Sequence, residues 1–159
     1  SSVGTDGRIH FYGHEKVGTE MAKTILERLR FPRKQIDDIA FTVRHHMQFK
    51  DVPRMRKATL RRMLLRPTFA LELEHHRIDC LASHGRLDNL EILKDEQATM
   101  DEQPTLIPPL VNGHDLLSIG IPKGPIMGKL LEDIRDKQLA EEFTTRDEAL
   151  AWAKEKAAQ

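Results

Sequence analysis

The sequence predicts an all-α protein, and three observations support this fold class. Apolar residues recur at three- and four-residue spacing along nearly the whole chain, which is typical of amphipathic helices. No segment alternates apolar and polar residues with the period of two that a half-buried strand requires. Proline and glycine stand where the helical periodicity stops. We therefore expect a helical bundle followed by a smaller helical subdomain.

Two apolar stripes define the first two predicted helices. The first stripe consists of Val17, Met21, Ile25 and Leu29. It ends near Phe31-Pro32, where the proline interrupts helical periodicity. The second stripe covers residues 36–43 and runs into the adjacent histidines His45 and His46. These segments predict a pair of helices joined by a short connection.

Three further helical segments complete the first 100 residues. A basic segment reaches Leu65 and is stopped at Arg66-Pro67. A segment rich in leucine and alanine covers residues 69–83, and Gly85 follows it as a helix stop. A short helical piece is expected around Leu90. We expect residues 1–100 to form one helical domain.

The composition changes after the first 100 residues. Three prolines and few periodic apolar residues in 101–111 indicate a linker. In 112–159, a short helical turn precedes a longer helix that begins near Pro125. Thr145 and Glu148 have the spacing of a capping box and open a last helix. Residues 112–159 are thus predicted to form a small helical subdomain.

Composition limits the classes of protein that the chain can represent. Charged residues make up 31% of the 159 residues, and the mean hydropathy is −0.51. No apolar run approaches the roughly 18 residues of a membrane span, and the N-terminus lacks the pattern of a secretory signal. The single cysteine, Cys80, rules out an internal disulfide and is typical of a reducing compartment. These features predict a cytoplasmic protein without a membrane segment.

Positive charge is concentrated between Lys50 and Arg66. Seven lysines and arginines stand there against one acidic residue, Asp51, although the whole chain is neutral. Clustered cations bind RNA phosphates with release of counterions, but they also occur on solvated helices that pair with nearby carboxylates. The candidates for contact with RNA phosphates are Arg54, Arg56, Lys57, Arg61 and Arg62.

The motif GIPKGPIMGK supplies a second set of candidates for binding phosphate. A lysine and free backbone N–H groups at a helix start can receive a phosphate, and glycine permits close approach of the backbone. A glycine-proline pair at a helix start is also a common structural feature. The candidate residues are Lys123, Gly124 and Lys129.

Histidines and one aspartate on three predicted helices form a candidate metal set. Imidazole and carboxylate groups bind divalent ions that activate water, and the helices of a bundle can bring them together. Such residues recur in any helical protein with eight histidines, and ordinary structural roles explain them as well: a first-turn position, a half-buried helix end, or an ion pair with Arg77 or Arg86. The candidate ligands are His14, His45, His46 and Asp79.

Four segments carry a resemblance to a known family. They are DGRIHFYGHEKVGTEMAKTILERLRFP, VRHHM, HRIDCLASHG and PPLVNGHDLLSIGIPKGPIMGKLLEDIRDKQL, and the similarity covers nearly the whole chain. They resemble the C-terminal half of bacterial CCA-adding tRNA nucleotidyltransferases, in the branch that carries an HD-type domain. The resemblance implies a truncated HD-type helical domain and a helical tail that together hold the body of tRNA.

The resemblance also assigns positions in the metal set of HD domains. His14 matches the histidine after the His-Asp dyad, and Asp79 matches the terminal aspartate. His45 and His46 match the later histidine region. The early histidine and the dyad are missing, as is the N-terminal catalytic head with its Gly-rich loop and paired aspartates. A set that lacks these ligands should bind metal weakly, so we expect a divalent ion (Mg, Mn or Ni) only in the intact parent protein.

Three functional hypotheses follow. The leading one is a part of a CCA-adding type tRNA nucleotidyltransferase that binds and positions tRNA and is inactive by itself. The alternative is an HD-type metal-dependent phosphohydrolase domain whose other ligands precede Ser1. The third is an interaction module that forms a homodimer through the helices after Pro104. The choice among CCA, CC, A and poly(A) addition would lie in the missing catalytic head.

Overall fold

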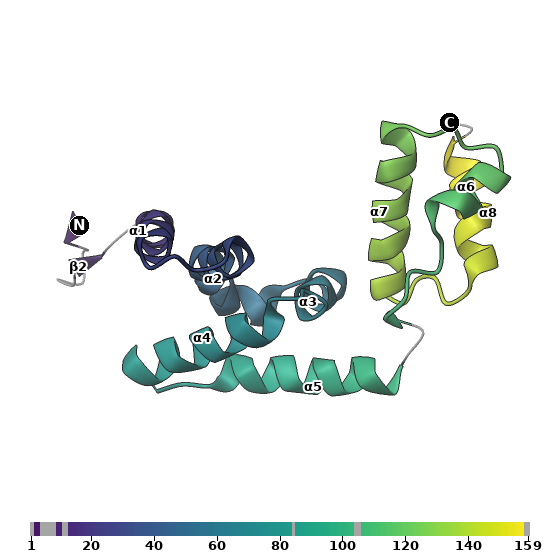
Figure 1. The fold of residues 1–159 in the computed structure, drawn as a ribbon. Coiled ribbons are helices and arrows are strands. Elements are labelled where there is room, and N and C mark those ends of the chain that lie inside the picture. The colour runs from purple at the N-terminus through teal and green to yellow at the C-terminus, as the bar shows by residue number, and fades with distance from the viewer. Residues whose placement is uncertain (1, 4–8, 11–12, 84, 104–105, 158–159) are drawn as a thin grey trace. The chain divides into compact units, whose positions relative to one another are not determined.

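The computed structural model describes residues 2–3, 9–10, 13–83, 85–103 and 106–157. Helices form most of this part of the chain, which confirms the predicted all-α class (Figure 1). The elements are, in chain order, β1 (Ser2–Val3), β2 (Ile9–His10), α1 (His14–Arg28), α2 (Arg33–His45), the 3₁₀ helix η1 (His46–Arg54), α3 (Lys57–Leu64), α4 (Phe69–Ser83), α5 (Asp88–Glu102), α6 (Gly113–Ser118), α7 (Pro125–Leu139) and α8 (Arg146–Ala157). Among the described helices, none is both long and apolar enough to cross a bilayer.

The sequence did not predict the short antiparallel pairing of β1 with β2. Ser2 pairs with His10, and Val3 pairs with Ile9. Two residues per strand are too few to display a period of two in the sequence. The pairing leaves the fold class unchanged.

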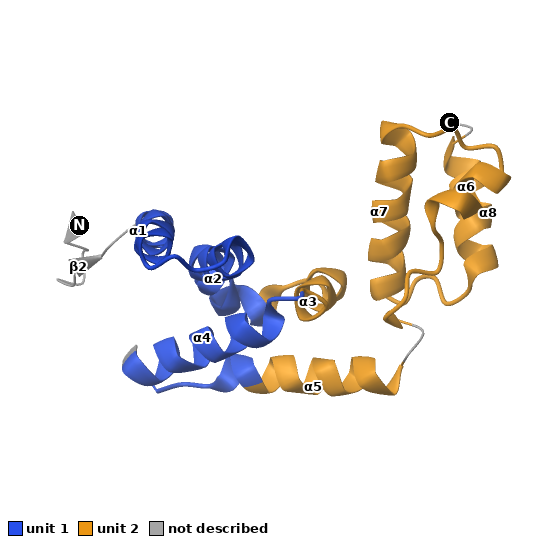
Figure 2. Ribbon diagram, in the orientation of Figure 1, with its two compact units in different colours: residues 1–53, 67–90 blue, residues 54–66, 91–159 orange. Residues whose placement is uncertain are grey.

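The chain forms two compact units (Figure 2). The first unit consists of Ser1–Pro53 and Pro67–Leu90, and the second consists of Arg54–Arg66 and Glu91–Gln159. Each unit therefore combines segments that are distant in the sequence. The division into domains 1–100 and 112–159 with a linker stays a prediction, because compactness does not show which part folds independently.

In the first unit, α2 packs against both α1 and α4. Its side chains Ile36 and Ala40 are buried, at a spacing of four residues on one helix face. Neighbouring elements contribute further buried side chains: Phe49 and Val52 from η1, and Phe69 and Cys80 from α4. The core of this unit is thus built from α2, η1 and α4.

The predicted apolar stripe of α1 has an unexpected environment. Val17, Met21, Ile25 and Leu29 are each exposed, by between 43% and 62%. We call these four residues the α1 stripe. The opposite side of α1 carries Thr19, which is buried and donates its hydroxyl hydrogen bond to the carbonyl of Glu15 at 2.6 Å. The helix therefore forms where predicted, but its most apolar side faces away from the rest of the unit.

In the second unit, α7 packs against α3, α6 and α8. One buried cluster joins α6, α7 and α8 and comprises Val111, Leu116, Ile121, Met127, Leu130, Ile134, Ala149 and Ala153. Trp152 and Phe143 pack against this cluster, with ring centroids 5.8 Å apart. Trp152 is therefore an apolar anchor of the last helix, as the sequence suggested.

Local signals in the sequence explain several helix ends of the second unit. Asn112 and Asp115 form a reciprocal capping box at the start of α6. The predicted capping pair of α8 is confirmed, because the Glu148 carboxylate accepts from the Thr145 amide at 3.0 Å and Thr145 Oγ1 accepts from the Glu148 amide at 3.3 Å. Pro125 is the first residue of α7, where its missing N–H leaves no hydrogen bond unmade.

The length of the helix around Leu90 was predicted wrongly. Instead of a short piece, α5 runs for 15 residues from Asp88 to Glu102 and includes the first two residues of the predicted linker. Leu90, Leu93 and Met100 recur on one side and are buried. The acidic composition near residue 100 obscured this periodicity.

Candidate functional site

The basic segment spans the end of η1 and all of α3. Arg54 is the last residue of η1, and Arg56 is the extended residue immediately before α3. Both arginines are exposed, and neither forms an ion pair within the described residues. These two guanidinium groups can therefore meet an external phosphate without first losing an internal partner.

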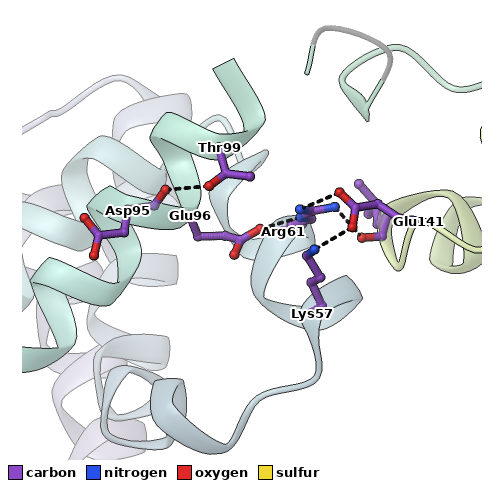
Figure 3. Close-up of polar contacts among 7 residues, drawn as sticks. Lys57, Arg61, Asp95, Glu96, Thr99 and Glu141 are labelled. Carbon is purple, nitrogen blue, oxygen red and sulfur yellow. Dashed lines mark hydrogen bonds and ion pairs between the residues drawn. The ribbon is translucent and has the colours of Figure 1, made fainter. Parts of the chain in front are cut away.

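Arg61 has a different role from the one the sequence suggested. Its side chain is fully buried, although it lies in the middle of the basic segment. Its guanidinium donates to Glu96 of α5 at 2.5 Å, to the carbonyl of Leu139 at 3.0 Å and to Glu141 at 3.1 Å (Figure 3). A buried charge requires such partners. We therefore correct the prediction for Arg61: it joins α3 to α5 and to the end of α7, and it is not presented to RNA.

Lys57 and Arg62 are partly exposed but already paired. Lys57 donates to Glu141 at 2.5 Å. Arg62 binds the carboxylate of Asp136 and donates to the carbonyl of Glu132 at 2.9 Å. Lys57, and then Arg61, hold the pKa of Glu141 below its usual value. Both cations can still add to a positive surface, but a phosphate would compete with these carboxylates for them.

The second set of predicted phosphate-binding residues lies around the start of α7. Lys123, Gly124 and Lys129 are all exposed. Gly124 has a φ of 154°, a conformation that side chains disfavour, and beyond Gly124 and its two chain neighbours no described atom lies within 4 Å of the place where its Cβ would stand. Among the residues that the structure describes, no side chain forms a capping hydrogen bond at this helix start. The backbone at this end of α7 is therefore accessible to a ligand, with a lysine on each side of it in the sequence.

The first unit brings together three histidines. His14, at the start of α1, has its Nε2 3.1 Å from Nε2 of His46. His46 also stacks on His75 of α4, with ring centroids 5.4 Å apart. His46 Nδ1 lies 2.7 Å from the carbonyl of Val43, so the neutral ring donates there and turns an acceptor nitrogen toward His14. We call His14, His46 and His75 the imidazole cluster.

The imidazole cluster differs from the predicted metal set in three residues, because it excludes His45 and Asp79 and includes His75. His45 lies apart from it: its Nδ1 donates to the carbonyl of Phe41 at 2.8 Å, and its ring packs on the Phe41 ring. His75 was missed, although it stands one helical turn before Asp79, a spacing that places both on one helix face. Burial, followed by the charge of His46, lowers the pKa of His75, while Asp79 opposes this shift.

The arrangement does not provide a complete set of metal ligands. Within the part of the chain that the structure describes, no group of three or more His, Cys, Asp or Glu side chains is placed to hold a metal ion. The described residues therefore do not fit a catalytic metal centre of the kind that needs three protein ligands.

These observations define a mainly helical protein with a partly exposed basic segment and an accessible helix start. A family model described as tRNA nucleotidyltransferase domain 2 matches residues 12–153. The chain therefore belongs to this family of tRNA nucleotidyltransferase domains, as its sequence resemblance implied.

Two curated relatives agree with this assignment. The chain is 31% identical over 160 residues to an A-adding tRNA nucleotidyltransferase of Deinococcus radiodurans, a match that covers 94% of this chain and 37% of the relative. It is 33% identical over 150 residues to a CC-adding tRNA nucleotidyltransferase of Thermus thermophilus, covering 92% of this chain and 34% of the relative. The chain thus spans about a third of the length of these relatives. No solved structure matches it significantly.

Proposed function

We propose that the chain is a tRNA-binding part of a CCA-, CC- or A-adding tRNA nucleotidyltransferase, acting in the cytoplasm. In this role it holds the tRNA body while a catalytic head, supplied by the rest of a family-length protein, adds nucleotides. The observation that carries the proposal is the pair Arg54 and Arg56, which are exposed and unpaired within the described residues of a chain matching this family.

Two surfaces of the second unit are proposed to contact RNA phosphates. The first contains Arg54 and Arg56, with weaker contributions from Lys57 and Arg62 because carboxylates already bind them. The second is the start of α7, where Lys123 and Lys129 flank the open backbone of Gly124. Contacts of this kind read the position and shape of the backbone and not its sequence.

A tRNA titration at several salt concentrations tests the proposal. Fluorescence anisotropy with a labelled tRNA transcript gives the slope of log K against log salt, which decreases by about 0.9 for each lost phosphate contact in duplex DNA and by a similar amount here. The double variant Arg54→Ala/Arg56→Ala should bind several-fold more weakly with a shallower slope. The matched control is Arg33→Ala/Lys34→Ala, which removes two exposed cations from the first unit. Equal effects of the two variants, or binding that is insensitive to salt, would contradict the proposal.

We propose separately that the imidazole cluster contributes to a metal site in a family-length protein. The divalent ion (Mg, Mn or Ni) would bind in a family-length protein, where residues outside this chain add ligands to His14, His46 and Asp79. The described residues alone do not complete a three-ligand site. The phosphohydrolase alternative depends on this ion, and nothing in the comparisons favours it. The metal content of a purified family-length protein, with and without His14→Ala, tests the metal role.

A further inference from the structure

The exposed α1 stripe is a surface that the described residues leave without a partner. Its members recur every four residues and therefore form one continuous ridge along α1. From Val17 to Leu29 the ridge is about 18 Å long at 1.5 Å per residue. The groove along α1 has a volume of about 670 Å³ and is mainly apolar, whereas a groove in the second unit that Leu110 and Arg135 help to line has a volume of about 410 Å³. The groove along α1 is lined by Lys16, Val17, Glu20, Met21, Thr24 and Ile25.

A second apolar ridge lies on α4 of the same unit. Leu71, Ile78 and Leu81 are between 44% and 54% exposed. His75 stands between Leu71 and Ile78 in helical spacing, and it stacks on His46, which in turn contacts His14 at the start of the α1 stripe. Both ridges therefore border the imidazole cluster. We call the two ridges together the open face of the first unit.

The apolar area and the charge of the open face restrict which partners can cover it. Seven half-exposed aliphatic side chains offer several hundred Å² of apolar area, less than the roughly 800 Å² that each partner buries in a stable interface between separate proteins. Positive and negative side chains alternate along α1, as in the ion pair of Lys23 with Glu20 at 3.0 Å. This mixture lacks the excess of positive charge that would attract a lipid surface or RNA.

We propose that the open face binds an amphipathic helix from the part of a family-length protein that lies outside residues 1–159. The two relatives are matched over only 37% and 34% of their lengths, so most of each relative lies outside the match. Within one polypeptide, docking loses little translational freedom, and a small apolar area is then sufficient. The partner helix presents leucine-like side chains at three- and four-residue spacing to the α1 stripe, along which the groove runs. The proposal does not depend on binding of tRNA.

Oxidation of Met21 by peroxide measures whether the α1 stripe is covered. Met21 is 59% exposed, while Met63 and Met100 are buried and serve as internal controls. The probes are the unmatched portions of the Deinococcus radiodurans and Thermus thermophilus relatives, each joined to residues 1–159 in a single polypeptide, and residues 1–159 alone are the reference. We expect at least one probe to slow oxidation of Met21 about tenfold, as followed by mass spectrometry, with the controls unchanged.

Two variants separate docking from folding. Ile25→Glu should abolish the protection of Met21 without lowering the stability of residues 1–159, because Ile25 is already exposed. Ile107→Glu places the same charge at an exposed site of the second unit and should leave the protection intact. The proposal is overturned if neither probe protects Met21, or if Ile25→Glu leaves protection unchanged. It is also overturned if light scattering shows a dimer of residues 1–159 that Ile25→Glu converts to a monomer, because the occupant is then a second copy.

Discussion

Replacing Arg61 with alanine should strongly destabilise the second unit. The substitution removes the donors to Glu96, Glu141 and the carbonyl of Leu139. Breaking a buried ion pair by removing one partner costs about 3–5 kcal/mol. The two carboxylates are 19% and 33% exposed, so water can restore part of their solvation. We therefore expect the lower end of that range, about 3 kcal/mol of unfolding free energy.

Urea unfolding followed by Trp152 fluorescence measures this loss, because Trp152 is the sole tryptophan and packs on the core of the same unit. With a denaturant slope of about 1.5 kcal/mol/M, the midpoint should fall by about 2 M. Arg54→Ala is the matched control: Arg54 is exposed, and its removal should change stability by less than about 0.5 kcal/mol. An Arg61→Ala midpoint within about 0.3 M of the wild-type value would refute the structural role of Arg61.

Three further predictions concern single groups. Lys57 and Arg61 lower the pKa of Glu141 from its usual 4.5, so the stabilising effect of the Glu141 carboxylate is present above pH 4.5 and is lost on acidification. The difference in urea midpoint between wild type and Glu141→Gln should therefore shrink below pH 4.5. A difference that stays constant with pH would argue against this ion pair. Asn112→Ala removes the cap of α6 and should reduce stability by about 1 kcal/mol in the same assay, whereas an unchanged midpoint would show that the cap is dispensable. The chain alone should not hydrolyse 2′,3′-cyclic nucleotides with Mn²⁺ or Ni²⁺, and chromatographic detection of the product would reopen the phosphohydrolase hypothesis.

Sequence signals predicted the helices well where the signal was local. The capping pair Thr145 and Glu148, and Pro125 at a helix start, involve residues within one turn of each other, so tertiary packing is not needed to interpret them. The extent of α5 was missed because its apolar positions are widely spaced among charged residues, and their burial depends on other segments of the chain. The exposure of the α1 stripe could not be predicted from the sequence either. Periodicity shows that a helix has an apolar side, but it does not show which segment covers that side.

The candidate sites were harder to predict because they depend on side-chain direction. His45 and His46 are adjacent in the sequence, but successive residues on a helix point about 100° apart, and only His46 reaches His14. His75 was detectable only through its spacing to Asp79, a weak signal in a chain with eight histidines. For Arg61, burial was the deciding property, and the charge pattern of its segment gave no indication of it.

The different environments of the basic cations make the salt dependence of tRNA binding a quantitative test of the fold. If all five predicted cations of this segment contacted phosphates, their joint contribution to the slope would be about 4.5. Arg61 is buried, and Lys57 and Arg62 already bind carboxylates, which leaves Arg54 and Arg56 with a contribution of about 1.8. The slope lost in Arg54→Ala/Arg56→Ala should therefore nearly equal the slope lost when Lys57 and Arg62 are replaced as well. A much larger loss in the quadruple variant would mean that tRNA displaces Glu141 and Asp136 from their cations.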